Sequence, residues 1–171
     1  YQKPPHVGAI LFEDALTQVG KLFYLLRSIL SERKQLFQGG DYKQYVITNG
    51  VACPAVLLII DNMASFREKT QQAYDNDLIR LARQGASYGI YLLITGGDFS
   101  MNDIPIQLAD QIRTDITLEL ASASQYTNVL RTVQPKILPE AGINGRGLVN
   151  LNGTVLEYQT ALALPGEDAY A

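Results

Sequence analysis

The sequence predicts an α/β protein built around a mostly parallel sheet flanked by helices. Two runs, Val56–Ile60 and Ile90–Ile94, are apolar at every position, and such strands are typical of parallel sheets that are buried on both faces. The first run ends abruptly at Asp61-Asn62 and the second at Thr95-Gly96-Gly97. A segment of helical pattern lies between them, so strand, helix and strand follow in the order of α/β folds.

Helices are expected before, between and after these strands. The first begins near Glu13 and ends before Gly39-Gly40, because an apolar stripe recurs at three- and four-residue steps up to that point. Its members are Leu16, Val19, Leu22, Phe23, Leu26, Ile29 and Leu30. A short helix is expected around 42–45, and a long one from about Ala64 to Arg83, which Gly85 ends.

The last third of the chain predicts a third strand, a helix and a hairpin. The strand covers 116–120, and Ser122 or Ser124 caps a helix that runs to about Arg131. A glycine-rich loop at 142–147 precedes two strands, 148–151 and 155–160, which Asn152-Gly153 joins as a hairpin turn. We expect one domain over residues 1–171.

Composition is that of a globular domain, with 47% hydrophobic and 18% charged residues among 171. The net charge of −3 gives no electrostatic case for tight binding to nucleic acid. The longest apolar runs are far too short to span a bilayer. Tyr1 is not a start residue and no secretory signal opens the chain, so we expect the sequence to begin inside a longer protein.

Five segments carry a resemblance to a known family. In chain order they are 31–37 with 42–45, 56–61, 81–85 with 89–92, 112–116 with 121–124, and 145–148. In this order and spacing they resemble the ATPase domain of the FtsK/SpoIIIE type, over the stretch from Leu26 to about Ala163. The resemblance is strongest to the C-terminal degenerate ATPase modules of type VII secretion translocases, called EccC or EssC. It implies a RecA-like P-loop NTPase core.

The resemblance also implies a nucleotide site. Asp61 stands at the position of the Walker B aspartate that holds Mg²⁺, although it could instead be a residue that ends a strand and caps the next helix. Asn62 stands where active members carry a glutamate, and Thr95 stands at the sensor position. Arg146 lies in a Gly-Arg-Gly turn near the end of the domain. The implied cofactors are ATP and Mg²⁺ in the intact parent domain, with none held tightly by this fragment.

Several departures from the family predict a module that does not hydrolyse ATP. No G-x-x-x-x-G-K-[ST] run is present in the sequence, so we expect the phosphate loop to lie upstream of Tyr1. An amide at Asn62 cannot take a proton from water, and Gly96-Gly97 offers no side chain to sense a phosphate. Asp115 stands where many members carry an arginine; Arg113 could compensate in part, but we interpret Asp115 as one half of a surface ion pair.

Three functions follow from these expectations. The first is a regulatory or substrate-docking module of a type VII secretion translocase, cytoplasmic and part of a membrane-anchored protein. Its partners would be neighbouring ATPase modules and the C-terminal signal of a secreted substrate. Apolar contacts to that signal could come from Tyr88, Phe99, Met101 and Ile104, although core or loop packing is the preferred interpretation for the last two.

The second function is an active DNA translocase of the FtsK/SpoIIIE type. The acidic balance of the chain and the residues Asn62 and Asp115 argue against it. The third is a part that only makes contacts within an oligomer, since ring-forming ATPases place nucleotides between subunits and a degenerate member can persist there.

Overall fold

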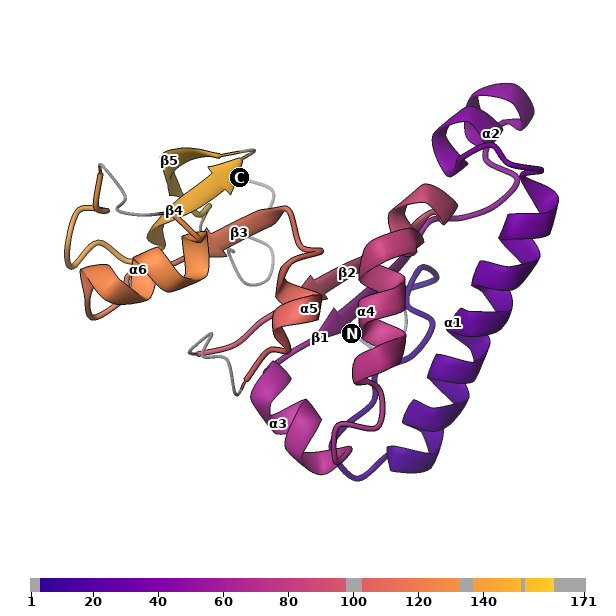
Figure 1. The fold of residues 1–171 in the computed structure, drawn as a ribbon, viewed down its shortest axis with the longest axis horizontal. Helices are drawn as coiled ribbons and strands as arrows, with labels where there is room; N and C mark the ends of the chain where they lie inside the picture. The colour runs from indigo at the N-terminus through magenta and orange to yellow at the C-terminus, as the bar shows by residue number, and fades with distance from the viewer. Residues whose placement is uncertain (1–3, 98–102, 133–136, 152, 162–171) are drawn as a thin grey trace. The chain divides into compact units, whose positions relative to one another are not determined.

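The computed structural model describes residues 4–97, 103–132, 137–151 and 153–161. They fall into two compact units (Figure 1). The first contains the described residues up to 97 together with 103–111, and the second contains those from 112 onwards. That the chain forms one domain stays a prediction, and the two units are described separately.

The first unit is built on the two apolar runs predicted as strands. β1 (Val56–Ile60) and β2 (Ile90–Ile94) pair in parallel, in a register that matches Val56 with Ile90 and Ile60 with Ile94. Pro54 lies just before β1, and Asp61 directly follows it. Because the strands are parallel, Asp61 and Thr95 leave the sheet at the same end.

Only one face of this parallel pair is covered in the described chain, so the prediction of burial on both faces is wrong for it. Ile60 and Ile90 are buried, whereas alternate side chains on the other face are open to solvent. These are Leu57, Ile59, Tyr91 and Leu93, with exposed fractions of 43–58%. Cross-strand pairing puts Leu57 beside Tyr91 and Ile59 beside Leu93, so the four form one apolar patch.

Helix α1 (Leu16–Leu36) lies alongside helix α4 (Asp75–Gln84) in the first unit (Figure 1). An ion pair of 2.7 Å joins Arg27 to Asp77, and two turns further along both helices Lys34 donates a hydrogen bond to the Gln84 side chain. The buried stripe of α1 extends further than predicted, since Arg33 follows Phe23, Leu26 and Leu30 on the same side. Gln38 and Gly39 have positive φ and end the helix where glycines were predicted to do so.

The helix expected from Ala64 to Arg83 is two helices, α3 (Met63–Lys69) and α4. The chain breaks at Gln71 and Gln72, which adopt left-handed backbone with φ of 50° and 60°. Arg67 and Asp75 close the break with a bidentate contact whose shortest distance is 2.9 Å. Glutamine is a good helix former and neither glycine nor proline marks the position, so helix propensity alone predicts no break here.

Short helices complete the first unit. α2 (Tyr42–Asn49) is longer than predicted. Asp41 is its N-cap, and the Asp41 side chain accepts a hydrogen bond from the Gln44 amide. Gly85 ends α4 as predicted, and a 3₁₀ turn, η1 (Gly85–Tyr88), leads into β2. α5 (Ile106–Ala109) is a single turn. None of the helices in the described ranges combines the length and the apolar character that crossing a bilayer requires.

Over its described residues, the second unit is an antiparallel sheet with one helix. β3 (Thr114–Thr117), β4 (Arg146–Leu151) and β5 (Thr154–Gln159) pair in the order β3-β4-β5, so the predicted hairpin is confirmed. The third strand begins two residues earlier than expected and pairs antiparallel with β4. Helix α6 (Ala123–Leu130) starts with a capping box made by Ser122, and its residues Tyr126 and Leu130 pack on Leu148.

Candidate functional site

Asp61 and Thr95 meet at the end of the parallel pair, and we call this place the Asp61 edge, made of Asp61, Asn62 and Thr95. The Thr95 hydroxyl donates a hydrogen bond of 2.5 Å to Asp61 Oδ1. The Thr95 amide donates to the Ile60 carbonyl at 3.0 Å, which continues the ladder of the sheet beyond the last strand residues. All three side chains of the Asp61 edge are exposed. The structure therefore puts Asp61 at the carboxyl end of a parallel strand, as the sequence predicted.

Asn62 performs a structural task at this edge. Its backbone is left-handed, with φ of 63°, and its side-chain oxygen accepts a hydrogen bond of 3.2 Å from the Ser65 amide. Asn62 is thus the N-cap of α3. Its own amide donates to the Thr95 hydroxyl at 3.0 Å. Asparagine tolerates left-handed backbone better than most residues, so this position suits an asparagine for conformational reasons alone.

Thr95 is the centre of the edge. Its hydroxyl accepts from Asn62 and donates to Asp61, while its carbonyl accepts from the Met63 amide at 2.9 Å. These bonds join the ends of both strands to the first turn of α3. The hydroxyl hydrogen of Thr95 therefore points at the Asp61 carboxylate. To donate to a bound ligand, the hydroxyl would have to give up this bond.

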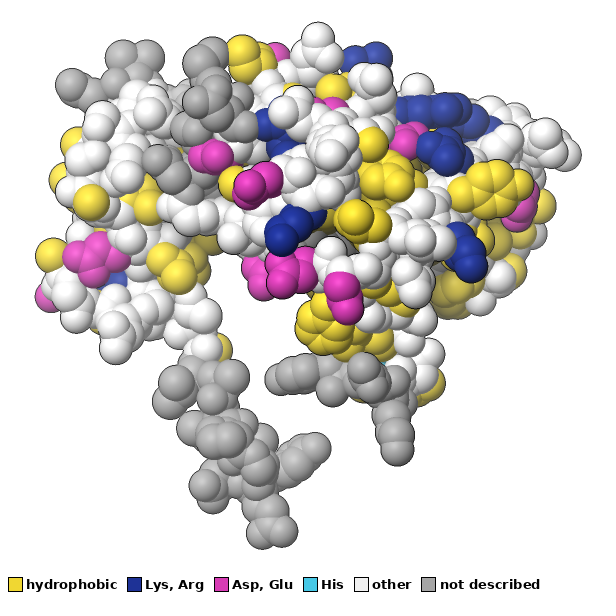
Figure 2. All heavy atoms as spheres, turned by 90° about the horizontal axis from the view of Figure 1, so that it is seen from below, with side chains coloured by type: hydrophobic (Ala, Val, Ile, Leu, Met, Phe, Trp, Pro, Cys, Tyr) yellow, Lys and Arg dark blue, Asp and Glu magenta, His cyan; other side chains and the backbone are white. Residues whose placement is uncertain are grey.

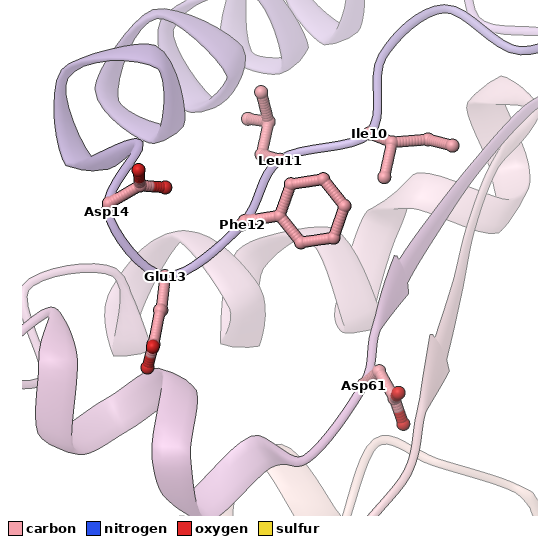
Figure 3. A pocket seen from close by; sticks show the side chains of 6 residues that line it. All are labelled: Ile10, Leu11, Phe12, Glu13, Asp14 and Asp61. Carbon is pink, nitrogen blue, oxygen red and sulfur yellow. The ribbon is translucent and has the colours of Figure 1, made fainter. Parts of the chain in front are cut away.

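A pocket of about 720 Å³ lies beside Asp61 (Figure 3). Its lining consists of Ile10, Leu11, Phe12, Glu13, Asp14 and Asp61. Figure 3 shows the loop that carries the first five of these across the pocket from Asp61, and the Glu13 side chain extends toward α3, where Lys69 pairs with it at 3.3 Å. Three carboxylates and no basic side chain line this pocket, so its potential favours a cation and disfavours a free phosphate.

A metal ion at this place would have few protein ligands. Within the described ranges no three His, Cys, Asp or Glu side chains are grouped so that they could hold one ion. Mg²⁺ is commonly bound by one or two carboxylates together with substrate phosphates and water. Asp61 therefore fits the role of a lone carboxylate ligand, but only where a phosphate supplies the remaining oxygens.

Arg146 lies in the second unit and faces carboxylates. Its Nε is 3.5 Å from Glu157 Oε1 and its Nη2 is 3.7 Å from Glu140 Oε2. These are long ion pairs, and the Nε is buried without a hydrogen bond in the described chain. The role of Arg146 at a nucleotide stays a prediction.

Asp115 forms the ion pair that the sequence interpretation expected. Its carboxylate accepts from Arg131 at 2.7 and 3.0 Å, and the Asp115 side chain is only 14% exposed. The same guanidinium donates to the carbonyl of Ile112. Asp115 thus fixes the left-handed end of α6 to the start of β3, whereas Arg113 is exposed.

The structure describes two of the four residues considered for peptide contact. Ile104 is 6% exposed and belongs to the core, as preferred, while Tyr88 is half-buried and stacks on Phe37. Phe99 and Met101 lie outside the described residues. The described structure thus leaves Tyr88 partly accessible and removes Ile104 from the surface.

Sequence reasoning missed Arg33, which is 6% exposed and donates to three backbone carbonyls of the first unit. A signal for it exists in the sequence. Phe23, Leu26, Leu30, Arg33 and Phe37 continue one stripe at three- and four-residue steps, and all five are buried. A charged residue that falls in register with a buried stripe is expected to have buried partners.

Comparisons with known proteins bear on the fold and the family. No protein-family model matches the chain. Among curated proteins, it is 26% identical over 150 residues to the type VII secretion system protein EssC of Staphylococcus aureus (strain MRSA252), which covers 85% of the chain. It is 23% identical over 167 residues to the ESX secretion system protein EccC of Geobacillus thermodenitrificans, which covers 96%. The chain spans about a tenth of the length of these relatives (10% and 11%).

Solved structures bear on the fold. The pCW3 conjugation coupling protein TcpA with ATPγS aligns with a TM-score of 0.72 at 23% identity, over 88% of this chain and 45% of that one. EssC (ATPases 2 and 3) from Geobacillus thermodenitrificans aligns with a TM-score of 0.73 at 22% identity, over 89% and 28%. Thermomonospora curvata EccC (ATPases 2 and 3) in complex with a signal sequence peptide aligns with 0.69 at 21%, over 92% and 28%.

The fold is that of a RecA-like P-loop ATPase domain, since the matched structures share this architecture over most of the chain. The role of the Asp61 edge stays a prediction. The predicted resemblance is confirmed more narrowly as well. The chain is similar to ATPase domains of the FtsK/SpoIIIE type, and the type VII secretion proteins EssC and EccC are among its relatives.

Proposed function

We propose that this chain is a degenerate ATPase module of a type VII secretion protein, one that does not hydrolyse ATP and serves regulation or substrate docking. The observation that carries the proposal is the side-chain chemistry and the conformation of Asn62. At the position where the resemblance places a catalytic glutamate, the side chain is an amide, its oxygen caps α3, and its backbone is left-handed. No general base is available there.

The surroundings of Asp61 support the same proposal. ATP and Mg²⁺ fit this edge in part: Asp61 offers an oxygen to Mg²⁺, which would neutralise phosphate charge when bound. The other carboxylates of the pocket, Glu13 and Asp14, would repel a triphosphate. The 171 residues contain no phosphate-cradling sequence. Nucleotide binding therefore depends on a phosphate loop that another part of the parent protein would supply.

The relatives support the proposed docking role. One similar protein, EccC of Thermomonospora curvata, is solved in complex with a signal sequence peptide. We propose that this chain belongs to a protein that binds the C-terminal signal of a secreted substrate and stacks with neighbouring ATPase modules. Its place would be the cytoplasmic side of a membrane-anchored protein.

The net charge argues against the alternative of an active DNA translocase. The chain carries 14 basic and 17 acidic residues. On the face drawn in Figure 2, acidic and basic side chains are interspersed with exposed hydrophobic ones, which is not the pattern of a phosphate-binding stripe. The likeness to TcpA shows a shared fold and supports no particular substrate.

A binding experiment tests this function. A fluorescent peptide that carries the C-terminal signal sequence of a type VII secretion substrate is titrated with the purified chain, with and without Mg²⁺ and ATP. We expect saturable binding, absent for a scrambled peptide of the same composition, and no phosphate release. DNA-stimulated phosphate release would instead support the translocase. The absence of both peptide binding and turnover would overturn the docking role and leave a part that only makes oligomer contacts.

A further inference from the structure

The apolar pattern of β1 and β2 does not specify how the two strands align. Both strands are hydrophobic at all five positions. Where one face of a strand is polar, a slip by one residue is penalised because it exposes the apolar set. Here a slip would exchange Leu58 and Ile60 for Leu57 and Ile59, which are of the same character. Other contacts must therefore select the observed register.

Arg33 contacts the backbone just before both strands begin, where a contact can fix their alignment. From α1, its Nη2 donates to the Pro54 carbonyl at 2.6 Å, on the segment that leads into β1. Its Nη1 donates to the carbonyls of Tyr88 and Gly89, at 2.7 and 3.2 Å, on the turn that leads into β2. One guanidinium thus spans the amino ends of both strands.

One of the carbonyls that Arg33 contacts also accepts the first hydrogen bond between the two strands. The Gly89 carbonyl that accepts from Arg33 also accepts from the Val56 amide at 2.8 Å. The Tyr42 ring lies beneath the guanidinium, with its centroid 5.7 Å from the Arg33 Cζ, and the Tyr42 hydroxyl donates to the Cys53 carbonyl at 2.9 Å. Both strands are therefore held at their starts by one buried side chain and the ring that supports it.

We propose that Arg33 is a positioning residue that sets the parallel register of β1 and β2 and so brings Asp61 to Thr95 at the other end of the sheet. Five residues of strand separate the two ends, about 17 Å at the usual rise. A slip of one residue would displace Asp61 from Thr95 by about 3.3 Å and break their hydrogen bond. The proposal concerns the geometry of the Asp61 edge and holds whether or not that edge binds nucleotide.

Arginine suits this task and lysine does not. The three acceptors lie on two different segments, and a planar fork with fixed donors can reach both at once. A lysine ammonium keeps the charge but is a compact point on a flexible stem, so it would contact one segment at a time. A role that needed only buried charge would be met by either residue.

Lys34 provides a matched control. It is the next residue of α1, is half-buried, and has its Nζ 5.6 Å from the Tyr88 ring centroid. Its hydrogen bond goes to the Gln84 side chain on α4, away from the start of either strand. Lys34→Met therefore removes a cation from the same helix and leaves the three hydrogen bonds of Arg33 to the starts of the strands in place.

Amide hydrogen exchange, measured residue by residue by NMR, tests the proposal on the whole chain. Two amides report the register at the far end: Thr95, which donates to Ile60, and Met63, which donates to Thr95. In Arg33→Met and in Arg33→Lys we expect both amides to exchange about tenfold faster relative to amides in the middle of α4, the factor of one charge-assisted hydrogen bond. In Lys34→Met we expect that ratio to stay unchanged.

A merely structural role for Arg33 gives a different result. Exchange would then rise by the same factor at Thr95, Met63 and α4, and the ratio would stay at its wild-type value in both variants, which would overturn the proposal. If Arg33→Met does not fold, Arg33→Lys alone decides. A wild-type ratio in Arg33→Lys contradicts the proposal, because this variant keeps the charge and loses only the fork.

Discussion

Substitution of Asn62 by glutamate separates a structural from a catalytic account of this position. The change restores the residue that active relatives of this type are expected to carry. In this structure it also removes the cap of α3, which contributes about 1 kcal/mol, and places a long side chain in left-handed backbone, which costs about 1–2 kcal/mol. We therefore expect Asn62→Glu to destabilise the chain by about 2–3 kcal/mol.

Thermal unfolding followed by circular dichroism measures this effect. For a chain of this size, the loss corresponds to a fall in Tm of about 5–10 °C. Asn62→Gly is the matched control, because glycine accepts φ of 63° without strain and is a tolerable cap, so its stability should stay within about 0.5 kcal/mol of wild type. An unchanged Tm for Asn62→Glu would refute the assignment of Asn62 as a conformationally selected cap.

Substitutions at three further positions test other contacts by the same measurement. Asp61→Ala should leave the fold intact, with a loss below about 1 kcal/mol, because Asp61 is exposed and makes one side-chain bond to Thr95; a loss of several kcal/mol would make it a structural residue. Thr95→Val should cost about 1 kcal/mol and Thr95→Ser less than half of that, because serine keeps the hydroxyl that joins Asp61 and Asn62; a loss for Thr95→Ser as large as that for Thr95→Val would contradict the central role of the hydroxyl. Gly89→Ala should cost about 2–3 kcal/mol, since φ is +71° and the new Cβ would lie 2.5 Å from the Tyr42 ring; a neutral result would contradict the packing of Tyr42 against Gly89.

The sequence predicted those elements that proline, glycine or a polar residue interrupts at the ends. Both parallel strands begin and end where expected, because Pro54, Asp61 and Gly96 interrupt apolar runs that have no other interruption. The hairpin was found for the same reason, through the Asn-Gly turn. The hydrogen bond between Thr95 and Asp61 was not predicted, because it depends on the register of the two strands, which their uniform apolar pattern does not specify.

Features that depend on tertiary contacts could not be predicted in this way. The break at Gln71 and Gln72 is stabilised by Arg67 and Asp75, which lie eight positions apart, and no local propensity reports that contact. The third strand pairs antiparallel with a segment about 30 residues further on, so its partner is invisible to local pattern. The apolar periodicity of α1 includes the position of Arg33. It does not show which groups Arg33 contacts, because its carbonyl partners lie 21 to 56 residues away.

The covered faces of the sheet show a limit of the hydrophobic pattern. A run that is apolar throughout was interpreted as a strand buried on both sides, and in the described chain Leu57 and Ile59 are exposed. The pattern shows that the side chains of both faces are suited to burial. It does not show whether the chain itself covers each face.

Phosphate release from Mg²⁺-ATP by the purified 171-residue chain tests the central claim most directly, with Asp61→Ala as the control for contaminating activity. The account predicts the same background rate for wild type and Asp61→Ala, with or without added DNA or signal peptide. Steady-state turnover by the wild type that Asp61→Ala abolishes would contradict it, because the Asp61 edge would then be a working hydrolytic site.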